Sequence, residues 1–309
     1  MTDFIPYSLL KKICYFPEDR FVAPDYFSDD TLRDAYVKNG FAVVPQVASD
    51  EAVQLIRDSY IRLQKNQSYF KADGFITTPN YGIETQQSIC DTLKQVNALV
   101  LPRIFDMQKI RYDFFSLLVI KFNKDRSFVT PHLDISMVDE LQSTTTFLWI
   151  PTEDIDEKNG ALLVLPGSHR WARWQKTHNR DITPIKKNAQ WLIKEMIPVY
   201  VKKGDVVVFD ASLIHGSMPN ISAAERVAMN TSVISNQCPM VHYEINPDTP
   251  DGMVEKFAID ISFWEQAAYI QSVAGKGYSV SMEPLRRQKQ LSKWNLRYLN
   301  KVYNPLLSK

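Results

Sequence analysis

The sequence contains little cysteine, no excess of charge of either sign and no long apolar run, and each shortage excludes a class of protein. Its three cysteines, Cys14, Cys90 and Cys238, are odd in number and far apart, which fits neither a disulfide framework nor a cysteine zinc site. The 36 basic and 35 acidic residues give a net charge of +1, so nothing indicates a nucleic-acid partner. The most apolar run, within 114–122, is far shorter than the roughly 20 residues that span a bilayer.

The first residues also lack the features of a secretory signal. Residues 1–7 show no basic segment followed by an apolar stretch, so we expect no signal peptide. The cysteine spacing favours reduced thiols, and the two observations together predict a cytoplasmic protein with no membrane partner. With 45% hydrophobic residues, the chain can bury a core that encloses a site.

Residues 29–66 have the pattern of two helices with a strand between them. Asn39-Gly40 is typical of a helix C-cap, and 41–47 is short, apolar and β-branched, as strands are. Ser49 then supplies an N-cap before apolar residues at helical spacing.

From Phe114 onward the pattern changes to short β-favouring segments separated by glycine, proline and asparagine. This pattern is typical of a sandwich or barrel. Helices are expected at 184–196, 260–274 and 285–303, and no linker separates two domains. The expected strands are 114–122, 143–150, 161–165, 206–209 and 226–234.

These segments predict a single domain over residues 1–309. We expect N-terminal helices and an opening strand in 1–110, a β core with a metal site in 111–240, and C-terminal helices in 241–309.

The segment Pro131-His132-Leu133-Asp134 suggests metal binding. On a strand, residues i and i+2 face the same side, so His132 and Asp134 can reach one ion. His215, at the end of an apolar strand, is the best third ligand. Two imidazoles and one carboxylate are the ligands of non-haem Fe(II) oxygenases, although Zn(II), Mn(II), Co(II) and Ni(II) would also bind. Taken alone, His-x-Asp more often marks a surface strand or a hydrogen-bonded histidine.

Arg226 is the candidate for holding a carboxylate. It lies eleven residues after His215, so a turn around Pro219-Asn220 would bring it back beside that histidine. Its fork-shaped guanidinium can form two hydrogen bonds to the distal carboxylate of an iron-bound 2-oxoglutarate. The alternative for a single arginine is a surface salt bridge.

Several such motifs stand in one order, and the chain resembles the phytanoyl-CoA dioxygenase family from about Tyr36 to Ile234. The resemblance rests on the opening Asn-Gly-Phe-Ala-Val-Val-Pro, on His132-x-Asp134, on Asn-Gly-Ala-Leu-Leu-Val-Leu-Pro-Gly-Ser-His, and on a segment that runs through His215 and Ser217 to Arg226. The first, third and fourth of these segments are residues 39–45, 159–169 and 204–226.

The resemblance implies a mainly β fold with flanking helices, a double-stranded β-helix of the jelly-roll, cupin-like type. It implies an enzyme that needs Fe(II), 2-oxoglutarate and O2, with the metal bound by His132, Asp134 and His215. It assigns 2-oxoglutarate to Arg226 and Ser217, with Trp149 lining the pocket and Lys121 as a further candidate. A solvated lysine is the alternative for Lys121. Leu133 departs from the glutamine that the family often has there, which puts nearby substrate contacts in doubt.

The predicted reaction is hydroxylation of a small-molecule metabolite, in biosynthesis for example, with release of succinate and CO2. Desaturation, epoxidation and ring closure use the same cofactor and stay open. The rival hypotheses are a non-catalytic cupin-like ligand-binding module and a zinc-dependent hydrolase. The hydrolase would not need Arg226, and the module would not need all three metal ligands.

The remaining histidines and cations give weaker predictions. We expect His169 to hold a loop by a hydrogen bond, and His178 and His242 to lie on the surface. The substrate is predicted to carry an anionic group, held by cations around the barrel mouth; the alternative is a set of solvated helix faces. The last helix would cover the entrance or join a second subunit, in a monomer or homodimer. The residues concerned are Lys121, Lys124, Arg126, Arg170, Trp171, Arg173, Trp174, Arg286, Arg287, Lys289, Lys293, Trp294 and Arg297.

Overall fold

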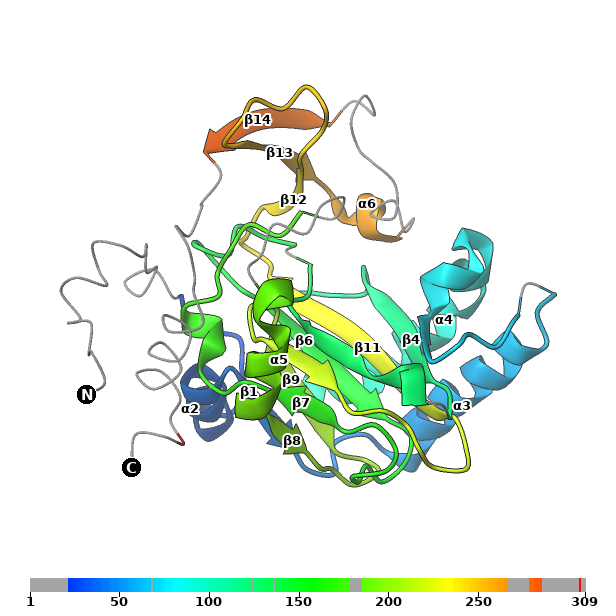
Figure 1. Cartoon of the computed structure of the whole chain (residues 1–309). Helices are drawn as coiled ribbons and strands as arrows, with labels where there is room; N and C mark the ends of the chain where they lie inside the picture. The colour runs from blue at the N-terminus through cyan, green and yellow to red at the C-terminus, as the bar shows by residue number, and fades with distance from the viewer. Residues whose placement is uncertain are drawn as a thin grey trace, which may run out of the picture.

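The computed structural model describes residues 22–67, 69–123, 125–135, 137–177, 185–265, 278–284 and 306. Within them, two antiparallel sheets pack face to face around a shared apolar cluster, as in a jelly roll (Figure 1). This confirms the predicted double-stranded β-helix. No helix in these ranges has the length and apolar character needed to cross a membrane.

The larger sheet has the strand order β1-β9-β6-β11-β4-β2, with β3 added beside β11. The smaller sheet has the order β5-β10-β7-β8. Two strands from the first 110 residues, β1 and β2, join the larger sheet, so the β core extends beyond the predicted 111–240. The bounds are β1 Phe41–Val44, β2 Phe75–Thr77, β3 Ile110–Arg111, β4 Ser116–Lys121, β5 Val129–His132, β6 Thr145–Pro151, β7 Leu162–Val164, β8 Ile197–Val199, β9 Val206–Asp210, β10 His215–Ser217 and β11 Arg226–Ser235.

The central strands of the larger sheet are buried on both faces, which explains why β4 and β9 are nearly continuous apolar runs. In β9, Val206 and Val208 face the helices, whereas Val207 and Phe209 face the smaller sheet. Successive side chains of a strand point to opposite faces, so a strand covered on both sides shows no polar alternation.

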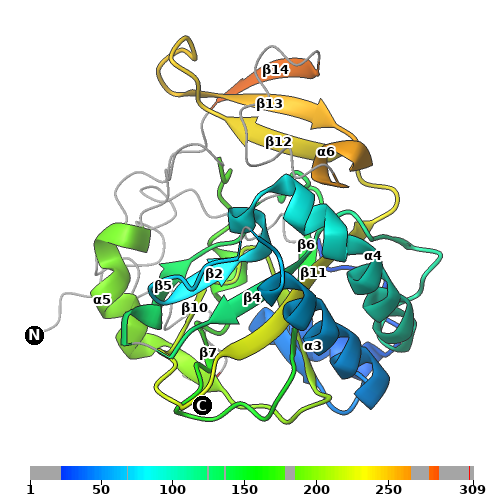
Figure 2. The same ribbon diagram turned by 90° about the vertical axis from the view of Figure 1, so that its right-hand side faces the viewer.

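Helices α3 and α4 lie side by side over the outer face of the larger sheet (Figure 2). The predicted caps are present, because the Ser49 side chain accepts from the Ala52 N–H and Gly40 follows the last turn of α2. The helix α4 was not predicted from the sequence. The helices are α2 Asp30–Asn39, α3 Asp50–Gln64, η2 Thr78–Tyr81, α4 Ile83–Val100, η3 Leu101–Arg103, η4 Asp125–Ser127, η5 Ser168–Arg170, α5 Ile185–Glu195 and α6 Ile261–Glu265.

The part after residue 240 differs from the predicted run of helices. It contains a separate three-stranded sheet, seen at the top of Figure 1, in the order β12-β13-β14. Of the helix expected at 260–274, the described part is the short α6, and the helix expected at 285–303 lies outside the described residues. The strands are β12 Met240–Glu244, β13 Met253–Ile259 and β14 Ser279–Pro284.

Gly40 shows why two of the sequence motifs occur together. Its φ is 82°, and a Cβ on it would lie 2.5 Å from Nδ1 of His169. The Gly167 N–H also donates to the Asn39 carbonyl over 2.8 Å. The 39–45 and 159–169 segments are therefore packed against each other, and only glycine combines that backbone angle with that close approach.

Candidate metal and co-substrate site

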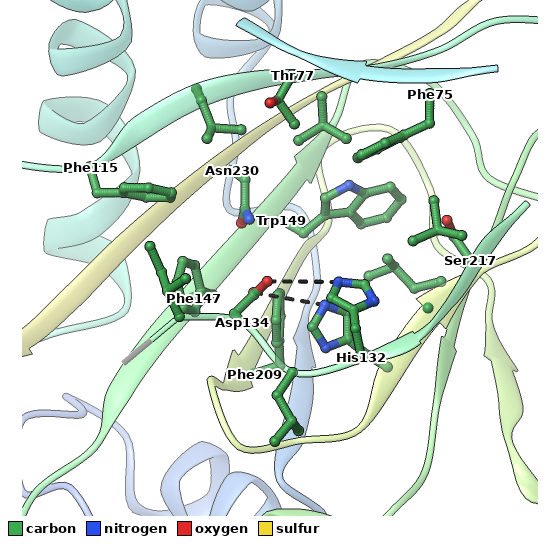
Figure 3. Close-up of a pocket in the computed structure, with 18 of the residues that line it drawn as sticks. Phe75, Thr77, Phe115, His132, Asp134, Phe147, Trp149, Phe209, Ser217 and Asn230 are labelled. Atoms are coloured by element: carbon green, nitrogen blue, oxygen red, sulfur yellow. Dashed lines mark ion pairs between the residues drawn. The ribbon is translucent and has the colours of Figure 1, made fainter. Parts of the chain in front are cut away.

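Three predicted ligands come from two neighbouring strands of the smaller sheet, the edge strand β5 and its partner β10, and from the loop after β5. His132 ends β5 and is paired in register with His215, which begins β10. Asp134 lies two residues beyond the end of β5, so the expectation that it shares a strand with His132 is wrong. The loop nevertheless turns its carboxylate back toward both imidazoles (Figure 3).

The three side chains form a cluster that could hold a metal ion. The Asp134 carboxylate oxygens lie 3.8 Å from Nε2 of His132 and 3.7 Å from Nε2 of His215. One ligand atom from each residue lies within 4.8 Å of the other two. Two atoms that bind one ion at about 2.0–2.2 Å can be at most roughly 4.4 Å apart, so both carboxylate–imidazole separations fit one ion.

The backbone fixes which nitrogen of each imidazole is available. Nδ1 of His132 lies 2.9 Å from the Thr130 carbonyl, and Nδ1 of His215 lies 3.0 Å from the Leu213 carbonyl. A carbonyl only accepts, so each Nδ1 carries the proton and each Nε2 keeps a lone pair for a metal. Burial, together with a smaller electrostatic contribution from neighbouring His132, lowers the pKa of His215 to about 4. This imidazole is therefore neutral at pH 7.

A cavity of about 330 Å³ opens beside these ligands between the two sheets (Figure 3). Ser217, Trp149 and Arg226, three predicted co-substrate residues, also line it. Its other lining residues were not identified from the sequence, although the period of two along β11 places Asn230 on the same face as Arg226. They include Phe75, Thr77, Phe115, Leu117, Phe147, Phe209 and Asn230.

Arg226 is almost fully buried in this cavity, with 1% of its surface exposed. Within the described part of the chain, its Nε and Nη1 have no hydrogen-bond partner. Its guanidinium carbon lies 5.2 Å from the centre of the Trp149 ring, a favourable cation–π arrangement. Burial lowers the pKa of Arg226 to about 10, which leaves it charged at neutral pH. The alternative of a surface salt bridge is wrong for this arginine.

Lys121 is also buried, so the alternative of a solvated lysine is wrong. It pairs with Arg226 across β4 and β11, and its Nζ donates to Ser217 Oγ over 2.7 Å and to the Met218 carbonyl. A Cβ on Gly160 would lie 2.5 Å from Cδ of Lys121, so the Asn-Gly turn leaves room for this side chain. Burial, with a smaller contribution from the Arg226 charge, lowers the pKa of Lys121 to about 6.

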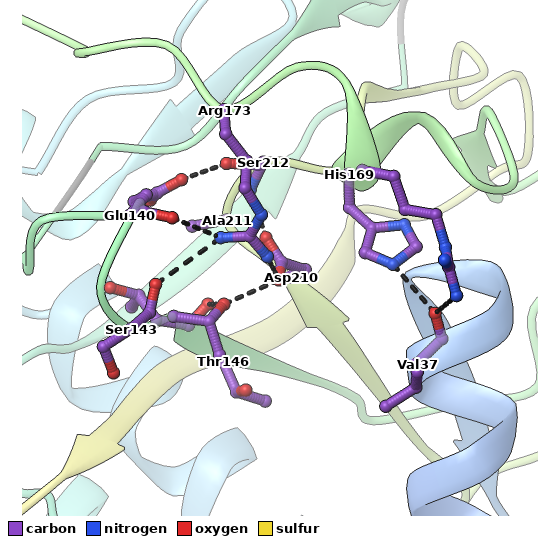
Figure 4. A network of polar contacts seen from close by, with 12 residues as sticks. Val37, Glu140, Ser143, Thr146, His169, Arg173, Asp210, Ala211 and Ser212 are labelled. Atoms are coloured by element: carbon purple, nitrogen blue, oxygen red, sulfur yellow. Dashed lines mark hydrogen bonds and ion pairs between the residues drawn. The ribbon is translucent and has the colours of Figure 1, made fainter. Parts of the chain in front are cut away.

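Two other histidines lie away from the cavity. His169 is buried and its Nε2 lies 3.1 Å from the Val37 carbonyl, which confirms the predicted hydrogen bond (Figure 4). His242 is buried beside Glu244, with Nε2 and Oε1 3.3 Å apart, so its predicted surface position is wrong. His178 lies outside the described residues.

The cations and aromatics expected around the barrel mouth mostly lie elsewhere. Arg126 pairs with exposed Asp73, and Arg170 donates to the Val37 carbonyl. Arg173 is buried in an ion pair, because its position faces Asp210 rather than the cavity. Trp171 and Trp174 belong to the apolar cluster under α5, whereas Lys124 and residues 285–305 lie outside the described residues.

Known proteins are similar to this chain in sequence and in fold. The family model of phytanoyl-CoA dioxygenase (PhyH) matches residues 36–228, more than half of the chain. Phytanoyl-CoA dioxygenase 1 of Oryza sativa subsp. japonica is 32% identical over 111 residues, 35% of this chain and 40% of that protein. The peroxisomal phytanoyl-CoA dioxygenase of Bos taurus is 25% identical over 266 residues, 74% of each chain.

A solved structure is similar to the fold. The non-haem alpha-ketoglutarate-dependent carbocyclase SnoK from nogalamycin biosynthesis superposes with a TM-score of 0.50 at 19% identity, over 69% of this chain and 86% of that one. The chain therefore has the jelly-roll fold of such oxygenases. It belongs to the phytanoyl-CoA dioxygenase family, whose enzymes use iron, 2-oxoglutarate and O2.

Proposed function

We propose that the chain is a 2-oxoglutarate-dependent dioxygenase whose Fe(II) is held by His132, Asp134 and His215. The proposal rests on one observation above all. An open set of two imidazoles and a carboxylate shares a cavity with a buried arginine whose guanidinium is not fully paired among the described residues. This ligand set suits Fe(II) and leaves positions open for a chelating 2-oxo acid and for dioxygen.

The distal carboxylate of 2-oxoglutarate binds Arg226 in this proposal. A buried guanidinium without a full set of hydrogen bonds is costly, and a carboxylate offers the planar, two-point partner that relieves the cost. Ser217 lines the same cavity, and its hydroxyl is the second partner of that carboxylate in the proposal. The Trp149 ring forms one wall of the pocket. Lys121 donates a hydrogen bond to the Ser217 hydroxyl, and its protonated form adds a second positive charge beside the pocket.

When bound, the iron and 2-oxoglutarate would activate dioxygen for breaking a carbon–hydrogen bond; one oxygen atom would enter succinate, released with CO2, and the other would oxidise the substrate. The chain's own residues orient the reactants and exclude water from them. His132 and His215 present Nε2 because their Nδ1 protons are held by backbone carbonyls. Hydroxylation is the proposed outcome, and desaturation, epoxidation or ring closure would use the same arrangement.

The substrate in this proposal is a small molecule. The names of the relatives suggest an acyl-CoA, and the name of the structural neighbour SnoK suggests a cyclisation substrate. An anionic group on the substrate, as predicted from the sequence, stays part of this proposal. The small number and wide spacing of the cysteines support the predicted cytoplasmic location. A monomer or homodimer stays a prediction.

Arg226 also separates this proposal from the two rivals. A zinc hydrolase has no need of a buried arginine beside its metal, and a non-catalytic module has no need of three intact ligands. The presence of both features in one cavity favours the oxygenase.

The anaerobic visible spectrum tests the proposal. Fe(II) with 2-oxoglutarate should give a weak charge-transfer band in the wild type, and Zn(II) should give none. Asp134→Ala should lose the band, and a surface variant such as Lys203→Ala should keep it. A wild-type protein that binds Fe(II) and shows no band at millimolar 2-oxoglutarate would contradict the proposed function.

A further inference from the structure

The cavity changes character along β11. Arg226, Ala228 and Asn230 follow each other on one face of the strand, because alternate residues point the same way. Four residues of a strand span roughly 14 Å, so Arg226 and Asn230 mark well-separated levels. Lys121 lies opposite Arg226, and Leu117 lies opposite Asn230. The cavity is therefore charged at one level and apolar at the other.

The apolar end is built mainly from aromatic rings. Phe115 and Phe147 meet edge to face with their centres 5.8 Å apart, and Phe209 stacks on Phe147 at 5.7 Å. Phe209 also touches the candidate metal ligand His215, with ring centres 4.9 Å apart. A group bound among these rings therefore lies close to the metal position.

Asn230 is the polar exception at this end. Its side chain lies between Phe115 and Trp149 (Figure 3). Its Oδ1 is buried, and no described residue donates a hydrogen bond to it. An unpaired buried amide is unfavourable, and a primary amide can both donate and accept. A ligand in the cavity can supply the missing partner.

We infer that the substrate places an uncharged, ring-sized apolar group among Phe115, Phe147 and Phe209 and one neutral polar group, a hydroxyl, carbonyl or amide, against Asn230. This inference rests on the proposed function and names the chemistry of its substrate. Asn230 is then a specificity-determining residue. It fixes how far the apolar group enters, and so which carbon faces the metal.

The charges of the described cavity support a neutral group at this end. Of the cavity-lining residues, Arg226 is the cation, and in the proposed function it holds 2-oxoglutarate. In the proposed holoenzyme, the charges of Asp134 and of the chelating carboxylate of 2-oxoglutarate offset that of Fe(II), so the metal offers no net positive charge to a second anion. An ionised carboxylate buried among aromatic rings without a paired charge is strongly disfavoured. An anionic group on the substrate therefore lies outside this part of the cavity.

The volume limits the size of the group. Ligand pockets range from roughly 300 to 1,000 Å³, and this one, at about 330 Å³, must hold 2-oxoglutarate as well. A single ring or a short branched chain is what the remaining space admits.

Three matched probes test the inference on the anaerobic Fe(II)–2-oxoglutarate holoenzyme. They are 2-phenylethanol, ethylbenzene and phenylacetate. All three share a phenyl ring; the first carries a hydroxyl, the second no polar group and the third a carboxylate. Binding is followed by the shift of the visible charge-transfer band, and each Kd is measured in the wild type, in Asn230→Leu and in Met229→Leu. Met229 is the matched control, because it neighbours Asn230 on β11 and faces the helices instead.

We expect 2-phenylethanol to bind the wild type more tightly than phenylacetate. The ratio of the ethylbenzene Kd to the 2-phenylethanol Kd should fall roughly 5- to 10-fold in Asn230→Leu, the effect of one hydrogen bond, and stay unchanged in Met229→Leu. An unchanged ratio in Asn230→Leu, tighter binding of phenylacetate, or no shift with any probe would overturn the inference. If the band itself fails to form in the wild type, the proposed function fails instead, so the two failures are distinguishable.

Discussion

Two buried polar clusters lie close together in the barrel and differ in how completely they are paired. In the first, Arg173 binds Asp210 over 2.7 Å and Lys176 binds Glu140 over 2.7 Å, and the Ser212 hydroxyl joins Glu140 (Figure 4). This set, which we call the ionic network, links three loops that flank the smaller sheet.

In the second cluster, the cavity beside β11, charged groups lack full partners. An Asp134 oxygen accepts no hydrogen bond, and Arg226 leaves two nitrogens unpaired within the described residues. Unpaired buried charge is strongly destabilising, so it is tolerated where a ligand completes the pairing. The difference separates a structural use of charge from a binding use, and substitutions in the two clusters should have opposite effects on stability and on activity.

The largest effect is expected from Asp134→Ala, which should abolish turnover while the fold survives. Loss of a direct metal ligand should exceed the roughly 10- to 100-fold effect typical of losing an outer partner. Iron content, succinate release and the denaturant midpoint measure the three outcomes, and His132→Ala should behave alike. Full activity with iron retained in either variant would refute the metal assignment.

Arg173→Met should have the reverse profile. Removing one partner leaves Asp210 buried and unpaired, which costs about 3–5 kcal/mol of unfolding free energy. The double variant Arg173→Met/Asp210→Asn should recover part of this loss, and the folded protein should still bind iron. Urea unfolding measures the stability. If Arg173→Met is as stable as the wild type, the ionic network is not a structural element.

Arg226→Ala should mainly damage 2-oxoglutarate use. Truncating one partner of a buried, hydrogen-bonded charge pair costs about 2–5 kcal/mol, roughly 30- to 5,000-fold in the apparent KM for 2-oxoglutarate. Unlike Arg173→Met, the variant should lose little stability in the absence of ligand, because the free guanidinium has no full set of partners to lose. An unchanged KM for 2-oxoglutarate beside a raised substrate KM would assign Arg226 to the substrate.

The sequence predicted the cluster of His132, Asp134 and His215 and the position of Arg226 beside it, because each is a chemically distinctive residue within an ordered set of motifs. It did not predict Asn230 or the aromatic wall. Phenylalanines in strands are equally expected in a core, and which of them face an empty space depends on how the two sheets pack. Asn230 carries no local pattern beyond its alternation with Arg226 along β11.

Burial of polar residues was the main error of the sequence interpretation. His242 was expected on the surface and Arg173 at the barrel mouth, and a solvated position was the alternative for Lys121. The partners that bury them, Glu244, Asp210 and Ser217, lie far away in the sequence or were not recognised. The sheet β12-β13-β14 was missed because its strands mix charged and apolar residues, and β-propensity depends strongly on neighbouring strands.

His169 should make the fold sensitive to acid. Burial lowers its pKa to about 3 in the folded protein, against about 6.5 in the unfolded chain. Between these values the unfolded state binds the extra proton, so stability is full above pH 6.5 and is lost as the pH falls, by up to about 1.4 kcal/mol per pH unit. Urea unfolding at several pH values should give a shallower slope for His169→Gln than for the wild type. Equal slopes would show that His169 is not the sensitive group, since His215 contributes alike to both proteins.

The smallest effect is expected from Lys121→Met. Burial lowers the pKa of Lys121 to about 6, so this lysine is mostly neutral in the free enzyme at pH 7. Its loss should raise the KM for 2-oxoglutarate only a few-fold, the effect of about one hydrogen bond.

A bound carboxylate favours the protonated form of Lys121 and raises its pKa. The affinity of the wild type for 2-oxoglutarate should therefore be constant below pH 6 and weaken as the pH rises above it. In Lys121→Met this dependence should disappear, whereas Arg226→Lys should retain it with a uniformly higher KM. If Lys121→Met keeps the wild-type pH profile, the lysine only fills space between Gly160 and Ser217, and Arg226 alone supplies the charge that the cavity offers to 2-oxoglutarate.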